Sequence, residues 1–185
     1  MRFLISLVIS TLLILPTLSA KSKGSSKSVN AFKLSNTINF DGLLTEAIWN
    51  KPSSNSFTQR DPEEGEPATE QTEVWVAYDE ESIYIAARLY DSQPDKIDAS
   101  LARRDSWHDS DWFTFYIDPY LDRKTGYYFS VNAGGSIRDG VYYNDSWSTD
   151  SWDGIWHAQT AVDDDGWSVE IKIPFLNYGL IIQRK

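Results

Sequence analysis

The sequence of 185 residues contains no cysteine. Disulfide bonds are therefore excluded, and so are thiolate nucleophiles and thiolate metal sites. In an oxidising compartment the stability of the chain has to come from its hydrophobic core, with or without a bound metal.

Histidine is almost as scarce, because only His108 and His157 are present. The sequence also lacks the G-x-S-x-G pattern, so a Ser-His-Asp or Cys-His catalytic centre has little support. Paired carboxylates for glycoside hydrolysis arise by chance among 27 acidic residues, and the group Asp105, Asp109 and Asp111 is not specific for that chemistry. We expect no catalytic residue, with a glycoside hydrolase as an alternative.

Basic residues are too few to balance the acids, with 17 Lys and Arg against 27 Asp and Glu and a net charge of −10. This charge repels phosphate backbones and anionic headgroups, so we expect no nucleic-acid partner and no membrane-surface partner. A neutral ligand or a cation fits better. The acidic runs at residues 118–122 and 163–166 offer oxygen ligands for calcium, but neither has the spacing of an EF-hand loop.

Long apolar runs are confined to the N-terminus. Residues 1–20 combine a positive start at Arg2, an apolar stretch over residues 3–15 and small residues before position 21, which is typical of a secretory signal peptide. The stretch is too short to favour a membrane span, and an uncleaved anchor is the lesser alternative. We expect an exported protein that is periplasmic, outer-membrane-associated or secreted, and whose mature charge is −11 because Arg2 is lost.

One domain is expected over residues 29–185, after a flexible polar linker at residues 21–28. Alternation of apolar and polar residues predicts strands at 72–78, 82–90, 112–117, 127–132, 136–143, 155–162 and 167–173, and weaker ones at 29–34, 37–40, 53–60 and 179–183. Only residues 43–50 have helical spacing, and Trp49 within them is expected in the core. The pattern predicts an all-β fold, an antiparallel β-sandwich of the immunoglobulin-like or jelly-roll type with one short helix.

Aromatic residues are abundant, since eight Trp and ten Tyr exceed the needs of a core of this size. Trp107, Trp147 and Trp152 lie in polar, loop-like sequence with Asp, Ser, His and Asn nearby. A pyranose ring has an apolar face of C–H groups and a rim of hydroxyls, so it suits a flat aromatic ring with polar neighbours. These tryptophans favour a sugar-binding surface, and burial of any one of them as a lid over the core remains the alternative.

Five blocks of sequence, in this order, resemble carbohydrate-binding module family 9. They are I-x-F-D-G-x-L-x-E-A-x-W (38–49), V-W-V-A-Y-D-E-E-S-I-Y-I (74–85), D-S-D-W-F-T-F-Y-I-D (109–118), T-G-Y-Y-F-S-V-N-A-G-G (125–135) and D-G-W-S-V-E-I-K-I-P-F (165–175). The resemblance implies a β-sandwich that binds oligosaccharides or glycan chain ends between two tryptophans, often with structural calcium. It also implies a link to polysaccharide catabolism, because such modules are joined to xylanases or precede a C-terminal region that resembles an outer-membrane barrel.

The resemblance assigns roles to particular residues of this sequence. Trp107 matches one wall of the tryptophan clamp and Gln183 a polar sugar contact. Apart from the resemblance, Asp109 and Arg104, which lie near Trp107 in the sequence, are further candidate contacts to hydroxyls. The family's second clamp tryptophan lies beyond the segment that residues 179–183 resemble, where this sequence ends. We therefore expect a truncated module, or a divergent one in which Trp147 or Trp152 supplies the second wall.

The expected function is thus that of an exported, non-catalytic carbohydrate-binding module. The main alternative is a structural or docking domain of a larger outer-membrane protein that has kept the sandwich and lost sugar binding.

Overall fold

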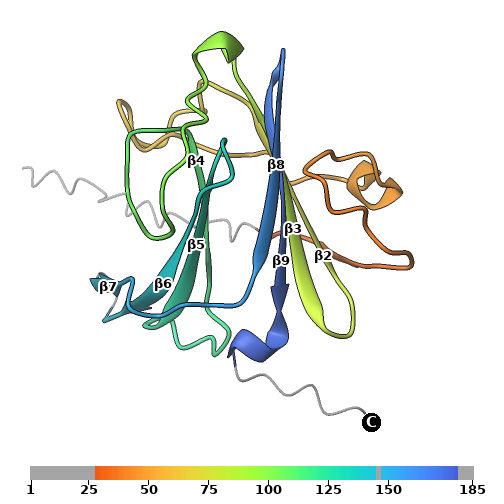
Figure 1. The fold of residues 1–185 in the computed structure, drawn as a ribbon, viewed down its shortest axis with the longest axis vertical. Coiled ribbons are helices and arrows are strands. Elements are labelled where there is room, and N and C mark those ends of the chain that lie inside the picture. Colours follow the sequence, from red (N-terminus) through yellow and green to blue (C-terminus); the bar gives the residue numbers. More distant parts are fainter. Residues whose placement is uncertain (1–27, 145–146, 179–185) are drawn as a thin grey trace, which may run out of the picture.

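The structure is a computed structural model, which describes residues 28–144 and 147–178. In that part of the chain, nine strands form two facing sheets (Figure 1). The five-stranded sheet has the order β1-β2-β3-β9-β8, and the four-stranded sheet has the order β4-β5-β6-β7. Neighbouring strands are antiparallel except for β1 and β2, which are parallel. The bounds are β1 (Ala31–Lys33), β2 (Thr72–Tyr78), β3 (Ser82–Tyr90), β4 (Trp112–Ile117), β5 (Gly126–Asn132), β6 (Ile137–Tyr143), β7 (Trp147–Thr149), β8 (His157–Asp163) and β9 (Gly166–Pro174).

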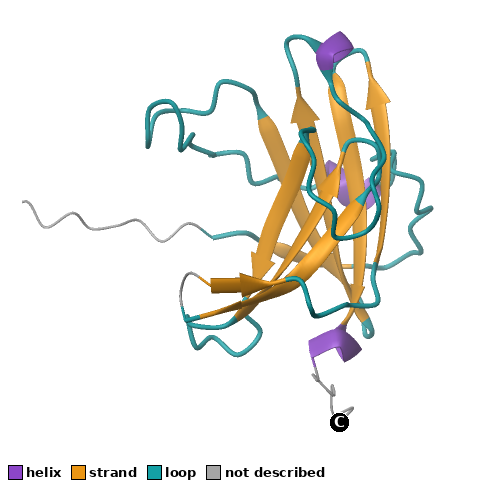
Figure 2. Ribbon diagram, turned by 60° about the vertical axis from the view of Figure 1, so that its left-hand side comes forward, coloured by secondary structure: helices purple, strands orange, loops and turns teal. Residues whose placement is uncertain are grey.

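The main hydrophobic core lies between the two sheets. Phe113 of β4 and Phe129 and Val131 of β5 face Val169 and Ile171 of β9, and all five side chains are buried. Successive side chains of a strand point to opposite faces, so the residues between these ones lie on the outer faces. Figure 2 shows the strands as layers, with the loops gathered at their ends.

A second, smaller core lies on the outer face of the five-stranded sheet. Trp75 of β2 and Tyr84 of β3 are buried there against Trp49, which belongs to the segment 34–51 that covers this face (Figure 1). The expectation that Trp49 is a core residue is therefore confirmed.

Glu170 of β9 fastens the covering segment to the sheet. Its buried carboxylate accepts hydrogen bonds from the Trp49 indole at 2.9 Å and from the backbone N–H groups of Asp41 at 3.1 Å and Gly42 at 3.0 Å. Gly42 has a φ of +83° and packs so closely on the backbone of Thr160 that a side chain would collide with it. Burial raises the pKa of Glu170, and the three hydrogen bonds counteract part of that shift.

The predicted fold class is confirmed, and most strands begin and end within two residues of their predicted bounds. The predicted helix at residues 43–50 is wrong in kind: only Ala47–Asn50 is helical, as a 3₁₀ helix, with further 3₁₀ helices at Pro94–Lys96 and Phe175–Tyr178. The turn at residues 41–42 and Pro52 leave too short a segment to nucleate an α-helix.

The weaker strands are corrected in several places. Residues 37–40 form no strand, and residues 53–60 make only isolated bridges, from Ser54 to Val74 and from Thr58 to Pro67. Pro52 and Pro62 flank this stretch and Pro67 lies opposite it, and their missing backbone donors limit regular pairing. Strand β7 lies in a stretch expected to be a loop, and the expected strand at 179–183 lies outside the described residues. Among the helices in the described part of the chain, none has the length and apolar character needed to cross a membrane.

Candidate functional site

Trp107 lies at the surface, in a loop of residues 98–111 that leads into β4 and is named the Trp107 loop below. Its side chain is 65% exposed. One face of its ring stacks on Trp112, with ring centroids 5.3 Å apart and planes 18° apart. Since Trp112 lies against one face, most of the exposed area belongs to the opposite face and the edges. A flat apolar surface is thus open to solvent.

Trp107 lies over the outer face of the four-stranded sheet. Its partner Trp112 precedes Phe113, whose side chain lies in the main core, so Trp112 points outward. The same holds for Arg138, which follows the core residue Ile137 and places its guanidinium carbon 5.1 Å from the centre of the Trp107 ring. Such a cation–aromatic contact further fixes the orientation of the exposed indole.

The buried amide of Asn132 ties the Trp107 loop to the end of β5. Its Nδ2 group donates to the carbonyl oxygen of Ser100 at 2.6 Å and to the hydroxyl oxygen of Ser110 at 3.0 Å. Its Oδ1 atom accepts the backbone N–H of Ser136 at 2.7 Å. One side chain therefore holds both ends of the loop on the β5–β6 turn, and Trp107 is positioned before any ligand arrives.

Asp105 forms a second anchor in the middle of the loop, at a left-handed φ of +61°. Its N–H donates to the carbonyl oxygen of Ile137 at 3.2 Å, and its carboxylate accepts the N–H of Asp139 at 3.1 Å. Burial raises the pKa of Asp105, and the negative charges of Asp139 and Asp153 act in the same direction. The loop is thus held along β6 as well as at its ends.

The structure does not bring Trp147 or Trp152 to Trp107. Trp147 is also 65% exposed, but it lies on the other face of the sheet. In β7 it pairs with Tyr143, and Tyr143 points away from the outer face because the preceding Tyr142 points toward it. Trp152 is half-buried, and its ring packs against Tyr127 and Phe129 on the core side. Neither ring lies opposite Trp107, so the described residues contain no clamp of two tryptophans around one sugar.

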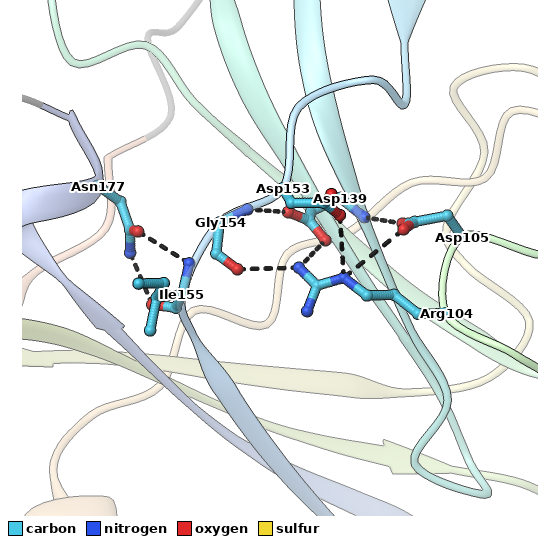
Figure 3. Close-up of polar contacts among 7 residues, drawn as sticks. All are labelled: Arg104, Asp105, Asp139, Asp153, Gly154, Ile155 and Asn177. Carbon is cyan, nitrogen blue, oxygen red and sulfur yellow. Dashed lines mark hydrogen bonds and ion pairs between the residues drawn. The ribbon is translucent and has the colours of Figure 1, made fainter.

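The three polar candidates have different surroundings. Asp109 is exposed in the Trp107 loop, two residues from the indole. Arg104 is turned away from Trp107, because its guanidinium donates to a carboxylate oxygen of Asp139 at 2.5 Å and to the carbonyl oxygen of Gly154 at 2.9 Å (Figure 3). Gln183 lies outside the described residues.

Arg104 is the centre of a cluster of three carboxylates. Asp105, Asp139 and Asp153 each offer one oxygen, and these oxygens lie within 4.8 Å of one another. Carboxylate oxygens are what calcium prefers, and the group could hold a metal ion if it were free. The Arg104 guanidinium instead supplies the positive charge, 3.5 Å from Asp105, 2.5 Å from Asp139 and 3.4 Å from Asp153 (Figure 3). The three carboxylates could hold a metal ion, and such an ion would have to displace Arg104.

Sequence reasoning missed two residues that shape the site, Trp112 and Arg138. Both lie in strands and were counted only as part of an alternating pattern. The pattern itself carries the signal: if Phe113 faces the core, Trp112 has to face outward, next to the polar loop that contains Trp107.

Comparisons with known proteins agree with the fold. No protein-family model matches the sequence, and no curated protein matches it. Among solved structures, a carbohydrate-binding module of family 9 from Caldicellulosiruptor kristjanssonii in complex with glucose aligns with 16% identity and a TM-score of 0.51, over 79% of this chain and 69% of that one. The same type of module in complex with cellotriose aligns with 16% identity and a TM-score of 0.50, over 80% and 67% of the two chains.

A proposed carbohydrate-binding protein from Bacteroides uniformis has a more similar backbone. Its TM-score is 0.64 at 10% identity, over 83% of this chain and 76% of that one. At such identities the likeness shows the fold, and the site has to be argued from the residues of this chain.

Proposed function

We propose that this chain is an exported, non-catalytic carbohydrate-binding module that stacks a sugar ring on the free face of Trp107. The observation that carries the proposal is a tryptophan that is 65% exposed and yet held in place by Trp112, Arg138 and an anchored loop. Exposing an aromatic ring to water is unfavourable in free energy. A ring that is exposed and also held in a fixed position therefore indicates a binding surface. The fold is also that of modules solved with glucose and cellotriose.

In the proposed complex, the C–H face of a pyranose lies on the Trp107 indole. Hydroxyl groups at its rim meet polar side chains of the same surface, for which Arg138 beside the ring and the exposed Asp109 of the Trp107 loop are candidates. The ligands are oligosaccharides or glycan chain ends, as in the family that the sequence resembles. Gln183 remains a proposed contact from that resemblance.

One aromatic platform gives limited affinity. An aromatic contact adds about 0.5–1.5 kcal/mol beyond its buried area, and a dissociation constant of about 1 mM corresponds to about 4 kcal/mol. With Trp147 and Trp152 on the other side of the sheet, a single sugar on Trp107 is expected to bind in the millimolar range.

The site needs no metal in this proposal. Arg104 already pairs with Asp105, Asp139 and Asp153 and offsets part of their negative charge, and calcium would enter only by replacing it. Export rests on residues 1–20, which are proposed to act as a signal peptide.

Titration of glucose, cello-oligosaccharides and xylo-oligosaccharides, followed by tryptophan fluorescence, tests the proposal. We expect saturable changes that are lost in Trp107→Ala. No response at tens of millimolar sugar would instead favour a docking domain without sugar binding. Release of reducing sugar that depends on one carboxylate would favour a hydrolase.

A further inference from the structure

The outer face of the four-stranded sheet continues beyond Trp107 to a second aromatic group. Tyr116 of β4 is 62% exposed, and its ring lies edge to face with that of Tyr142 on β6, with centroids 5.2 Å apart. Tyr142 contacts Tyr128 of β5 in the same way at 5.6 Å. Three tyrosine rings thus form a patch at the end of β4 opposite to Trp112.

A polar row separates the two aromatic groups. The strand register places Thr114, Ser130 and Arg138 side by side across β4, β5 and β6. The hydroxyl oxygens of Thr114 and Ser130 lie 2.8 Å apart, and the Arg138 guanidinium reaches toward Trp107. Along β4 the face therefore reads aromatic, polar, aromatic, with Trp112, Thr114 and Tyr116 in turn.

A hollow of about 210 Å³ adjoins the tyrosine patch. Tyr116 and Tyr142 line it together with Arg123, Lys124 and Thr125 from the loop after β4. This loop is ordered by its own carboxylates: Asp118 accepts the backbone N–H of Arg123 at 2.8 Å, and Asp122 accepts those of Lys124 and Thr125, each at 2.8 Å. The hollow thus offers an aromatic wall beside a loop with an ordered backbone and polar side chains, which are the two parts of a sugar site.

The floor of the patch depends on the absence of a side chain at Gly140 of β6. A Cβ atom there would lie 2.5 Å from the Tyr128 ring, so the glycine lets that ring lie directly on the backbone of β6. Tyr128 is buried in this position and supports Tyr142 from below.

The spacing of the two aromatic groups suits a chain of sugars. Trp107 is stacked on Trp112 at one end of this face, and Trp112 and Tyr116 are four residues apart in one strand, which corresponds to about 14 Å. That is the length of about three linked pyranose rings, and hydroxyls of the middle ring would meet the polar row.

We infer that the outer face binds a linear oligosaccharide along its length, with a second sugar subsite at Tyr116 and Tyr142. This inference rests on the proposed function, since Trp107 supplies the first subsite. It names the ligand class more closely, as an extended stretch of a glycan of about three rings, and it does not depend on a second tryptophan wall.

The test is a calorimetric titration of glucose, cellobiose, cellotriose and cellotetraose, and of the matching xylose series, into the mature protein. We expect affinity to rise up to the trisaccharide and then to level off. Tyr116→Ala is expected to weaken trisaccharide binding about three- to tenfold and to leave glucose binding unchanged, because glucose occupies the Trp107 subsite. Tyr116→Phe keeps the ring and should retain most of the affinity.

Tyr120→Ala is the matched control. Tyr120 is 60% exposed and lies in the loop after β4, but it interacts with Tyr127, whose side chain belongs to the core side of the sheet. Its removal is expected to leave every affinity unchanged, and circular dichroism shows whether each variant is folded.

The possible failures are distinguishable. Trp107-dependent binding that is equal for glucose and cellotriose, or that is unaffected by Tyr116→Ala, would overturn the second subsite and leave the proposed function standing. Absence of binding for every sugar of both series would overturn the proposed function, and the second subsite with it.

Discussion

Replacing Asn132 by alanine tests whether the Trp107 loop is held ready for its ligand. The residue touches neither the free face of Trp107 nor the tyrosine patch, yet its buried amide joins Ser100 and Ser110 to the β5–β6 turn. We expect Asn132→Ala to lower both stability and sugar affinity, although no sugar contact is removed.

The size of the effect follows from the hydrogen bonds that are lost. A buried donor or acceptor without a partner costs about 1–3 kcal/mol, and the substitution strands one such group, the N–H of Ser136, whereas the exposed carbonyl of Ser100 keeps its contact with His108. The free energy of unfolding should fall by about 1–3 kcal/mol, or roughly 3–10 °C in Tm. Ordering a released loop on binding costs about 0.5–1.5 kcal/mol for each immobilised side chain, so sugar affinity should fall about three- to tenfold.

Asn177→Ala provides the matched control. Its amide makes an equivalent clamp with the backbone of Ile155, accepting the N–H at 2.9 Å and donating to the carbonyl at 2.8 Å, and neither residue belongs to the Trp107 loop (Figure 3). These bonds are exposed, so water replaces them and the loss should be about 1 kcal/mol. Chemical denaturation and calorimetry on both variants separate stability from binding.

We expect lower affinity only in Asn132→Ala. If that variant is folded, loses the expected stability and still binds cellotriose as the wild type does, the loop needs no anchoring and the argument from preorganisation is refuted. An equal loss of affinity in Asn177→Ala would show that any destabilisation weakens binding.

Three further predictions concern the rest of the scaffold. Glu170→Ala should lower the free energy of unfolding by about 2–4 kcal/mol, because buried donors lose their acceptor, and a change below about 0.5 kcal/mol by denaturant titration would contradict this. Burial raises the pKa of Glu170 in the folded state above its ordinary 4.5. The stability that comes from this pKa shift is fully present below pH 4.5 and is lost as pH rises through the raised pKa. The difference in free energy of unfolding between wild type and Glu170→Ala should therefore become smaller over that pH range. A calcium chelator should leave the Tm of the wild type unchanged. The variant Arg104→Ala should lose about 2 kcal/mol in free energy of unfolding and should be stabilised by added calcium. A lower Tm of the wild type after chelation would show that a metal displaces Arg104. Gly140→Ala should displace the Tyr128 ring and the backbone of Thr149 in β7, lowering Tm and trisaccharide affinity together, and unchanged calorimetric values for both would contradict the close packing seen there.

The strands of this fold could be predicted because alternation is local. The hairpin of β2 and β3 is confirmed at the predicted residues, since each strand has one face in a core and the turn between them is short. Strand β7 could not be predicted in this way. Its three residues lie in polar sequence, and they form a strand because β6 offers a free edge for pairing.

The candidate site was predictable only in part, because local sequence cannot say which tryptophan finds a core. Trp107 and Trp152 have similar polar neighbours, but Trp152 packs on Tyr127 and Phe129, which are more than twenty residues away in sequence. Arg104 likewise pairs with Asp139 across the fold, which removes it from the sugar contacts expected of it. Such pairings depend on strand register, which the resemblance to a family does not supply residue by residue.

The central claim is that Trp107 carries sugar binding, and calorimetric titration of cellotriose into the wild type, Trp107→Ala and Trp147→Ala tests it most directly. The two tryptophans are equally exposed at 65% but lie on opposite faces of the sheet, so each substitution removes a similar apolar surface. We expect binding by the wild type and by Trp147→Ala, and affinity at least about tenfold weaker in Trp107→Ala. Unaltered binding by Trp107→Ala, or the same loss in both variants, would contradict the claim.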